Sequence, residues 1–260
     1  MEIMILGILQ ARVSSSRLPV KVLKPILCQP MLLRQIERLL RIKSIDKLMV
    51  ATSVDPSDDP IEELCLLNDI ECFRGSLNDV LDRFYQGAKK YRPEHVVRFT
   101  GDCPLTDFVL IDEVIQFYLK GCFDYISNAI APTFPDGLDV EVFQFSSLEE
   151  AWEKAQLPSE REHVTPFIYK HPELYKIACY KNNEDLSALR WTVDEQEDFD
   201  FVNKVFELLY ENNPAFTKGD ILSLLEKYPE LASINSKYQR NEGFEKSLQL
   251  DKKYQEKNYE

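Results

Sequence analysis

The residues best suited to chemistry lie in a short basic loop near the N-terminus. Directly after an apolar run, the chain reads Leu9-Gln10-Ala11-Arg12-Val13-Ser14-Ser15-Ser16-Arg17-Leu18-Pro19-Val20-Lys21. Residues 3–36 contain no Asp or Glu but hold five basic side chains, namely Arg12, Arg17, Lys21, Lys24 and Arg34. In a chain of net charge −13, such a cationic segment indicates a site for an anion. The three serines leave backbone N–H groups accessible and add hydroxyl donors, as a polyphosphate site requires.

The elements that must position this loop alternate between strand and helix over the first half of the chain. Strands are expected at 3–9, 47–52, 71–74 and 95–100, and helices at 31–43, 61–68, 78–90 and 108–120. This alternation predicts a doubly wound, mostly parallel α/β sheet. Ligands of such sheets bind beyond the carboxyl ends of the strands. The basic loop, Arg74-Gly75-Ser76 and Gly101-Asp102-Cys103-Pro104 should therefore meet at one crevice.

The second half of the chain is less regular. We expect an antiparallel strand at 138–145, a late strand at 189–193 that ends at Asp194, and helices at 147–155, 197–212 and 217–227. The last helix opens with a pair typical of a capping box, Thr217 and Asp220. Residues 1–235 are expected to form one domain. The polar segment 236–260 is expected to be a loosely packed or partly disordered tail.

Composition excludes several classes of function. With 260 residues and 44% hydrophobic content the chain can bury a large core. A net charge of −13 argues against a nucleic-acid binder or a protein of anionic membranes, because either needs a broad basic face. Six scattered cysteines without a C-x-x-C pair indicate reduced thiols and a cytoplasmic protein. The apolar start is too short to span a membrane and is expected to be a strand.

Several motifs resemble one known family. The pattern Gln10-Ala11-Arg12-x-x-x-Ser16-Arg17-Leu18-Pro19-x-Lys21 is similar to the nucleotide-binding signature of cytidylyltransferases that activate acidic sugars. More closely, the chain resembles the family of the spore coat polysaccharide biosynthesis protein SpsF. Segments that match include 74–84, 100–105, 134–141, 160–166 and 190–194, so the resemblance covers about residues 1 to 245.

This resemblance implies a fold and a reaction. The fold is the nucleotide-diphosphosugar transferase (GT-A-like) α/β fold, with one antiparallel strand, a small dimerisation and acceptor lobe, and a homodimeric assembly. The reaction is attack of an acceptor oxygen on the α-phosphorus of CTP, which gives a CMP conjugate and pyrophosphate. The acceptor would be a small acidic sugar. Because such a reaction is catalysed mainly by positioning and charge stabilisation, it needs basic side chains and a divalent cation.

The resemblance assigns the nucleotide to the basic loop and its neighbours. Arg12 and Lys21 suit the phosphates and the catalytic step, and Ser16 with the loop N–H groups can hold phosphate oxygens. The residues expected to read the cytosine are Leu9, Gln10, Ala11, Arg74, Ser76, Asp79 and Arg83. For Asp79 and Arg83, a solvated helix face with ion pairs is the alternative.

Two carboxylates are expected to hold Mg²⁺. Asp102 ends a strand in a tight turn, and Asp194 resembles the second metal-binding aspartate of the family. Asp102 is also expected to be catalytic. As an alternative, each aspartate could merely cap the helix that follows it.

The acceptor is assigned to the second half of the chain. Asp139 and Glu141 have the same parity on a strand and face one side. Arg161 and His163 follow in a segment that the family uses near the acceptor. For His163, a buried histidine at a helix cap or an interface is the alternative reading.

Two other functions compete with a cytidylyltransferase. A glycosyltransferase of the same fold usually carries an Asp-x-Asp motif, whereas this chain has Asp102-Cys103-Pro104. A catalytically silent partner in polysaccharide assembly would have no use for Arg12, Lys21, Asp102 and Asp194 together.

The basic loop departs from the family at one position. The family usually has glycine where Val20 stands, and often where Cys28 stands. Valine is strained at positive φ, so we expect Val20 to keep a negative φ and to obstruct the phosphate end of the loop in part.

Overall fold

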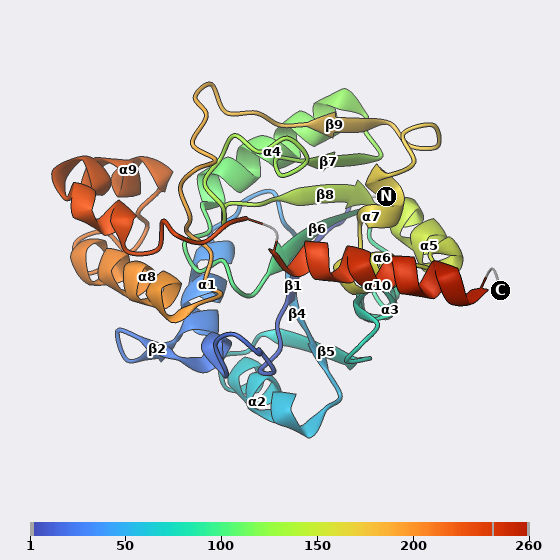
Figure 1. The fold of residues 1–260 in the computed structure, drawn as a ribbon, viewed down its shortest axis with the longest axis horizontal. Coiled ribbons are helices and arrows are strands. Elements are labelled where there is room, and N and C mark those ends of the chain that lie inside the picture. The colour runs from blue at the N-terminus through green and yellow to red at the C-terminus, as the bar shows by residue number, and fades with distance from the viewer. Residues whose placement is uncertain (1–2, 241, 259–260) are drawn as a thin grey trace.

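The computed structural model describes residues 3–240 and 242–258. Its main sheet has seven strands in the order β5-β4-β1-β6-β8-β7-β9 (Figure 1). Their bounds are β1 (Ile5–Gln10), β4 (Lys47–Ser53), β5 (Glu71–Gly75), β6 (His95–Thr100), β7 (Tyr125–Ser127), β8 (Glu141–Gln144) and β9 (Ile177–Cys179). All neighbouring strands pair in parallel except β8, which is antiparallel to both β6 and β7. The mostly parallel sheet with one antiparallel strand is confirmed.

Helices pack on both faces of this sheet. Their bounds are α1 (Met31–Leu39), α2 (Asp59–Leu67), α3 (Val80–Lys89), α4 (Phe108–Gly121), α5 (Phe145–Lys154), α6 (Pro158–His163), α7 (Pro166–Tyr169), α8 (Gln196–Leu209), α9 (Lys218–Lys227) and α10 (Glu242–Asn258). The shorter 3₁₀ helices are η1 (Lys21–Leu23), η2 (Pro56–Asp58) and η3 (Pro229–Ser233), and a small separate hairpin pairs β2 (Pro25–Ile26) with β3 (Gln29–Pro30).

Alternate residues of the strands point to opposite faces, as strand geometry requires. Leu9 and Val50 join a core cluster with α1, α4 and α8, whereas Leu6, Ile8 and Met49 join a second cluster with α3 and α5. The central strands are therefore buried on both sides, which explains their nearly continuous apolar sequence. The doubly wound prediction is confirmed.

The expected strands and helices of the first half are found within a few residues of their predicted ends. The capping box of α9 is also confirmed, because the Thr217 backbone N–H and hydroxyl both donate to the Asp220 carboxylate. The sequence pattern did not predict β7 and β9. Each has three residues, which is too short for an alternation to be recognised.

The strand expected at 189–193 is wrong. The segment forms only one isolated bridge, between Asp136 and Arg190. Trp191 and Val193 are buried, which accounts for the apolar pattern. Their backbone N–H groups donate to the carbonyls of Asp136 and Asp102. Tertiary contacts rather than a strand ladder therefore hold this segment extended.

The expectation of a loosely packed tail is wrong for residues 242–258, which form α10. The backbone N–H and the hydroxyl of Ser159 donate to the carboxylate of Asp251, at 2.8 and 2.6 Å. In Figure 1, α10 crosses the face of the molecule in front of α6 and beside α3. Residues 259–260 lie outside the described part of the chain.

Candidate active site

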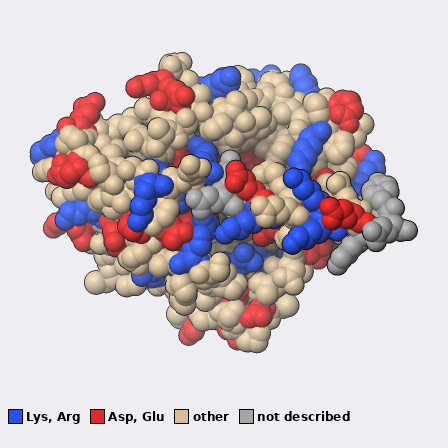
Figure 2. Space-filling view, in the orientation of Figure 1, with Lys and Arg blue, Asp and Glu red and all other residues tan. Residues whose placement is uncertain are grey.

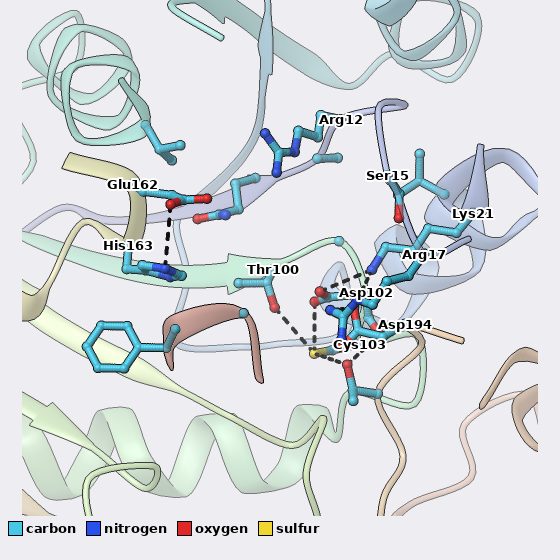
Figure 3. A pocket seen from close by; sticks show the side chains of 18 of the residues that line it. Arg12, Ser15, Arg17, Lys21, Thr100, Asp102, Cys103, Glu162, His163 and Asp194 are labelled. Carbon is cyan, nitrogen blue, oxygen red and sulfur yellow. Dashed lines mark hydrogen bonds and ion pairs between the residues drawn. The ribbon is translucent and has the colours of Figure 1, made fainter. Parts of the chain in front are cut away.

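A cavity of about 500 Å³ opens at the carboxyl ends of β1 and β6. The basic loop after β1, the turn after β6, α6 and α10 supply parts of its wall (Figure 3). Ten of the residues predicted from sequence line it, namely Gln10, Ala11, Arg12, Ser16, Lys21, Arg83, Asp102, Asp139, His163 and Asp194. The predicted meeting of the basic loop with the turn at Asp102 is therefore found.

The basic loop is anchored from below by a buried carboxylate. The Val13 N–H donates to Asp58 at 2.7 Å, and the same carboxylate accepts from the backbone N–H and the hydroxyl of Ser53 at the end of β4. Asp58 is completely buried. This anchor ties the loop to the sheet and leaves Arg12 exposed at the cavity.

The prediction for Val20 is wrong. Its φ is 60° and its ψ is 19°, which is the left-handed conformation that glycine adopts without strain. The backbone is held there because the Val20 N–H donates to the Val13 carbonyl, and the Val20 carbonyl accepts from Leu23. The side chain is 45% exposed and does not line the cavity. This loop therefore keeps the backbone shape that a glycine would give it.

Lys21 lies between the two carboxylates expected to hold metal. Its Nζ is 3.4 Å from Asp102 Oδ2 and 2.9 Å from Asp194 Oδ1, and it donates to the Val193 carbonyl at 2.7 Å. Burial alone would lower the pKa of Lys21, but Asp102 and Asp194 outweigh it and the pKa is raised. Burial alone would raise the pKa of Asp102, yet Lys21 and hydrogen bonds bring it to about 2. Both partners are thus held in their charged forms.

The two aspartates do not cap the helices that follow them. The N-cap of α4 is Asp107, whose carboxylate accepts from Val109 and Leu110, and the N-cap of α8 is Glu195. Asp102 and Asp194 are left to face the cavity. The capping alternative is therefore excluded for both.

Buried charges fix the position of Asp194. Arg190 pairs with Asp136, Asp194 and Asp198, and Asp198 also accepts from the Asp194 N–H at 3.0 Å. Arg17 reaches the other oxygen of Asp194 at 2.7 Å. Asp194 is thus positioned by its own segment and by the basic loop together, although these lie far apart in the sequence.

The donor set at Lys21 fits a hard divalent cation. Oxygens of Asp102 and Asp194 both approach one point, now taken by the Lys21 ammonium. Among residues 3–240 and 242–258, no three His, Cys, Asp or Glu side chains gather around a common point. Two protein carboxylates would leave the rest of an octahedral shell to phosphate oxygens and water, which is the set that Mg²⁺ usually takes.

Glu141 is placed differently from the prediction. It does not line the cavity but lies under it, where it pairs with Arg98 and accepts from the hydroxyls of Tyr125 and Thr165. Its carboxylate therefore has no free oxygen for an acceptor. Arg98 in turn donates from Nε to Gln10 Oε1 at 3.1 Å and lines the cavity. Glu141 thus orients Arg98.

Asp139 does line the cavity, and it pairs there with Arg240. Burial raises its pKa despite that partner. Burial and the nearby Asp139 also raise the pKa of Asp136 to about 7. This end of the site is consequently a buried group of acids whose charge is only partly balanced.

Four predicted residues bind each other or the main chain and do not line the cavity. Arg161 donates from Nε to both carboxylate oxygens of Asp79, at 3.0 Å each. This contact connects α6 to the start of α3. Ser76 accepts from the Asp79 N–H. Arg74 donates to the carbonyls of Ser53 and Asp55 and pairs with acids of α2. For Asp79, the ion-pair alternative fits the structure better than base recognition.

Two other predicted residues, Leu9 and Arg83, are buried. Leu9 is fully buried in β1, so only its backbone could meet a ligand. Arg83 is 2% exposed and its Nε has no hydrogen-bond partner among the described residues. Burial lowers the pKa of Arg83 to about 10, and the adjacent Arg12 acts in the same direction. Arg12 and Arg83 therefore form a cationic wall.

Sequence reasoning missed several residues that line the cavity, namely Arg98, Asp136, Glu162, Arg190, Phe244, Lys246 and Ser247. A buried arginine within the apolar strand β6 was a signal for Arg98. The residues of α10 carry no such signal, because they lie in the polar segment for which the sequence predicts a tail. Figure 2 shows Lys and Arg side chains gathered in the middle of the face that α10 crosses, in a protein that is acidic overall.

Comparisons with known proteins identify the family. Residues 6–253 match the cytidylyltransferase family. This chain belongs to the cytidylyltransferase family. It is therefore a CTP-dependent nucleotidyltransferase, and residues 242–253 of α10 lie within the family match.

Individual cytidylyltransferase relatives extend over almost the whole chain. It is 32% identical over 241 residues to the spore coat polysaccharide biosynthesis protein SpsF of Bacillus subtilis, covering 88% of this chain and 97% of that protein. It is 41% identical over 239 residues to an uncharacterised protein of Methanocaldococcus jannaschii, covering 89% and 94%. The structure of a cytidylyltransferase from Leptospira borgpetersenii superimposes with a TM-score of 0.84 at 32% identity, covering 89% and 97%. These likenesses place the chain with cytidylyltransferases of the SpsF type.

Within the part of the chain that the structure describes, every helix is too short or too polar to cross a bilayer.

Proposed function

We propose that this cytidylyltransferase transfers CMP from CTP to an oxygen of an acidic sugar or a related acid, with release of pyrophosphate, for the synthesis of a surface polysaccharide or glycan. The observation that carries the proposal is the buried Lys21 ammonium shared by Asp102 and Asp194 beside a basic loop. A triphosphate has about four negative charges, and transfer of its α-phosphoryl group needs this combination of cations and metal-binding oxygens. The SpsF relative is a spore coat polysaccharide biosynthesis protein, which supports a role in making a polysaccharide.

The basic loop would hold the phosphates. Arg12 is exposed at the cavity and makes no hydrogen bond or ion pair with any residue in the described ranges, so its guanidinium is available to a ligand. Ser16 and the loop N–H groups would take non-bridging oxygens. Lys21 is the cation nearest the carboxylates, and it would stabilise the charge that develops as pyrophosphate leaves.

Asp102 and Asp194 would hold Mg²⁺. When bound, this ion would neutralise phosphate charge and polarise the phosphorus for attack. The Lys21 ammonium now occupies the point between the carboxylates, so it would move toward the phosphate oxygens. Arg17 and Arg190 would keep Asp194 in place meanwhile, because both pair with it.

The acceptor would lie in the part of the cavity between Asp139 and His163. Arg98 and Arg12 supply positive charge at this end and would attract an acidic group. For Arg161 and Glu141 we propose a supporting role in place of acceptor contact, since both are engaged by other side chains. We further propose a cytoplasmic homodimer, supported by the resemblance to the family and by six free cysteines.

Pyrophosphate release tests this function. The protein is mixed with CTP, Mg²⁺ and a panel of 2-keto sugar acids, and pyrophosphate is followed with a coupled assay. We expect release with CTP and at least one acid, and loss of at least about 100-fold in kcat for Asp102→Asn, because an amide is a poor Mg²⁺ ligand. The control is Asp69→Asn, which removes an exposed carboxylate outside the cavity. Its kcat should equal that of the wild type. Near-normal turnover by Asp102→Asn would exclude the metal role.

A further inference from the structure

A serine of α10 makes two short hydrogen bonds to residues of α6 at the wall of the cavity, and a longer one of 3.4 Å to the Gly243 carbonyl of its own helix. Ser247 is 2% exposed, and its Oγ lies 2.9 Å from His163 Nε2 and 2.7 Å from Glu162 Oε2. Both partners belong to α6, and all three residues line the cavity. A helix from the last part of the chain thus contacts the proposed acceptor end directly.

These two contacts decide where the imidazole carries its proton. A serine hydroxyl has one hydrogen, and a carboxylate can only accept. The Glu162 carboxylate at 2.7 Å is closer than the Gly243 carbonyl at 3.4 Å, so the Ser247 O–H donates to Glu162. The Ser247 oxygen is then an acceptor for His163, and Nε2 must carry a hydrogen. The reverse arrangement would place the lone pairs of Ser247 and Glu162 against each other at 2.7 Å. The Nε2–H tautomer is the one that satisfies all three groups.

The other ring nitrogen, Nδ1, then has a lone pair that no residue in the described part of the chain uses. No hydrogen bond joins His163 Nδ1 to any residue in the described ranges. Figure 3 shows the imidazole reaching from α6 into the cavity, across from Lys21 and Asp102. Burial, and then the positive charge of Arg98, lowers the pKa of His163 to about 4. The ring is therefore neutral near pH 7, and Nδ1 can accept a hydrogen bond.

We propose that α10 is part of the active site and that Ser247 is a positioning residue, which holds His163 as the Nε2–H tautomer so that Nδ1 accepts a hydrogen bond from a hydroxyl or amine of the acceptor. This assignment rests on the proposed function for the identity of the ligand. It also sets a selectivity rule. The acceptor group at His163 must be a hydrogen-bond donor, and the acidic group must lie elsewhere, near Arg12 and Arg98.

The tautomer is measured directly by ¹⁵N NMR of the full chain labelled at histidine. The chain has three histidines, and His163→Gln identifies the signals of interest. We expect His163 at pH 7 to carry one proton, on Nε2. In Ser247→Ala the Nε2 signal should shift and its proton should exchange faster with water. Ser247→Thr keeps the hydroxyl and should keep the wild-type signal. Gln249→Ala, an exposed position of the same helix, is the matched control.

Two results would overturn the inference. One is a wild-type His163 that carries its proton on Nδ1 or on both nitrogens. The other is a Ser247→Ala spectrum that equals that of Gln249→Ala. The wild-type spectrum alone decides the tautomer if Ser247→Ala does not fold.

A kinetic measurement tests the contact with the acceptor. With an acid that supports pyrophosphate release, Ser247→Ala should lower kcat/KM for that acid by at least about tenfold and leave KM for CTP within about twofold. An equal rise in both KM values would indicate a general loss of structure and would overturn the positioning role. If no acid supports release, the proposed function fails, while the NMR result still decides the tautomer.

Discussion

The backbone of Val20 lies in the left-handed region, which suits a valine side chain poorly. A β-branched residue in the left-handed region is strained by roughly 1–2 kcal/mol. Residues other than glycine also have a positive φ in the turn of the β2–β3 hairpin, where the φ values of Leu27 and Cys28 are 47° and 64°. A two-residue hairpin of this type needs positive φ at both positions and normally selects Asn or Gly. Val20 and Cys28, the two positions where the resemblance leads us to expect glycine, thus both have a positive φ.

Val20→Gly should therefore stabilise the protein. The strain is removed, whereas the extra freedom of glycine in the unfolded chain costs about 0.5–1 kcal/mol. Because the valine side chain is 45% exposed, little packing is lost. We expect a net gain of about 0.5–1 kcal/mol in the free energy of unfolding, measured by chemical denaturation.

Val20→Ala is the control for this change, because alanine keeps the Cβ atom that causes the strain. It should be no more stable than the wild type. Equal stability of the Gly and Ala variants would show that the loop is not strained at this position.

At the scale of elements, α10 depends on a small number of buried polar contacts. Its mean hydropathy is low and many of its side chains are exposed, so it cannot hold its place by apolar burial alone. Asp251 is 6% exposed and accepts two hydrogen bonds from Ser159 at the start of α6. Ser247 makes the second polar contact with α6. We therefore expect α10 to open more easily than the sheet.

Asp251→Ala should loosen α10 without unfolding the domain. The change leaves the Ser159 N–H and hydroxyl without their partner, which costs about 1–3 kcal/mol. Hydrogen exchange should become faster in α10 and at the start of α6, but not in β1 or β6. Lys252→Ala alters an exposed neighbour and should leave exchange unchanged. Uniformly faster exchange across the sheet would contradict an independent role for this contact.

At the scale of the whole molecule, charge is distributed unevenly. The protein has a net charge of −13, yet Arg12, Arg83, Arg98 and Lys246 surround one cavity. Cations that lie close together repel one another. Burial is the main reason why the pKa of Arg83 is lowered, and the charge of Arg12 acts in the same direction. Binding of an anion would relieve this repulsion. A bound nucleotide should therefore stabilise the folded state in two ways, through its own contacts and through the relief of this repulsion.

CTP with Mg²⁺ should raise the melting temperature more than ATP, GTP or UTP does. At 100 times its Kd, a ligand adds about 2.7 kcal/mol to the free energy of unfolding. For a chain of this size that corresponds to a rise of about 5–10 °C. Differential scanning fluorimetry with the four nucleotides measures it. Equal shifts with all four would contradict selective binding of cytidine.

The parts of the fold that local patterns specify were predictable. The buried strands β1 and β6 each carry an apolar run, and the α9 capping box consists of residues three apart in the chain. The placement of Lys21 and Asp102 in one crevice also followed, because parallel strands end at the same edge of a sheet. Such features depend on neighbours in the chain or on a general rule of topology.

Other features depend on contacts between distant segments, which no local pattern records. Glu141 was expected at the acceptor but is taken by Arg98 and Tyr125. Similarly, Asp79 pairs with Arg161 across 82 positions of the chain. The sequence predicts a tail at 236–260, because the few buried groups of 242–258 are polar and their partners on α6 lie more than 80 positions away. A polar side chain has the same sequence signature in water and in a buried hydrogen bond, so only the folded chain distinguishes the two.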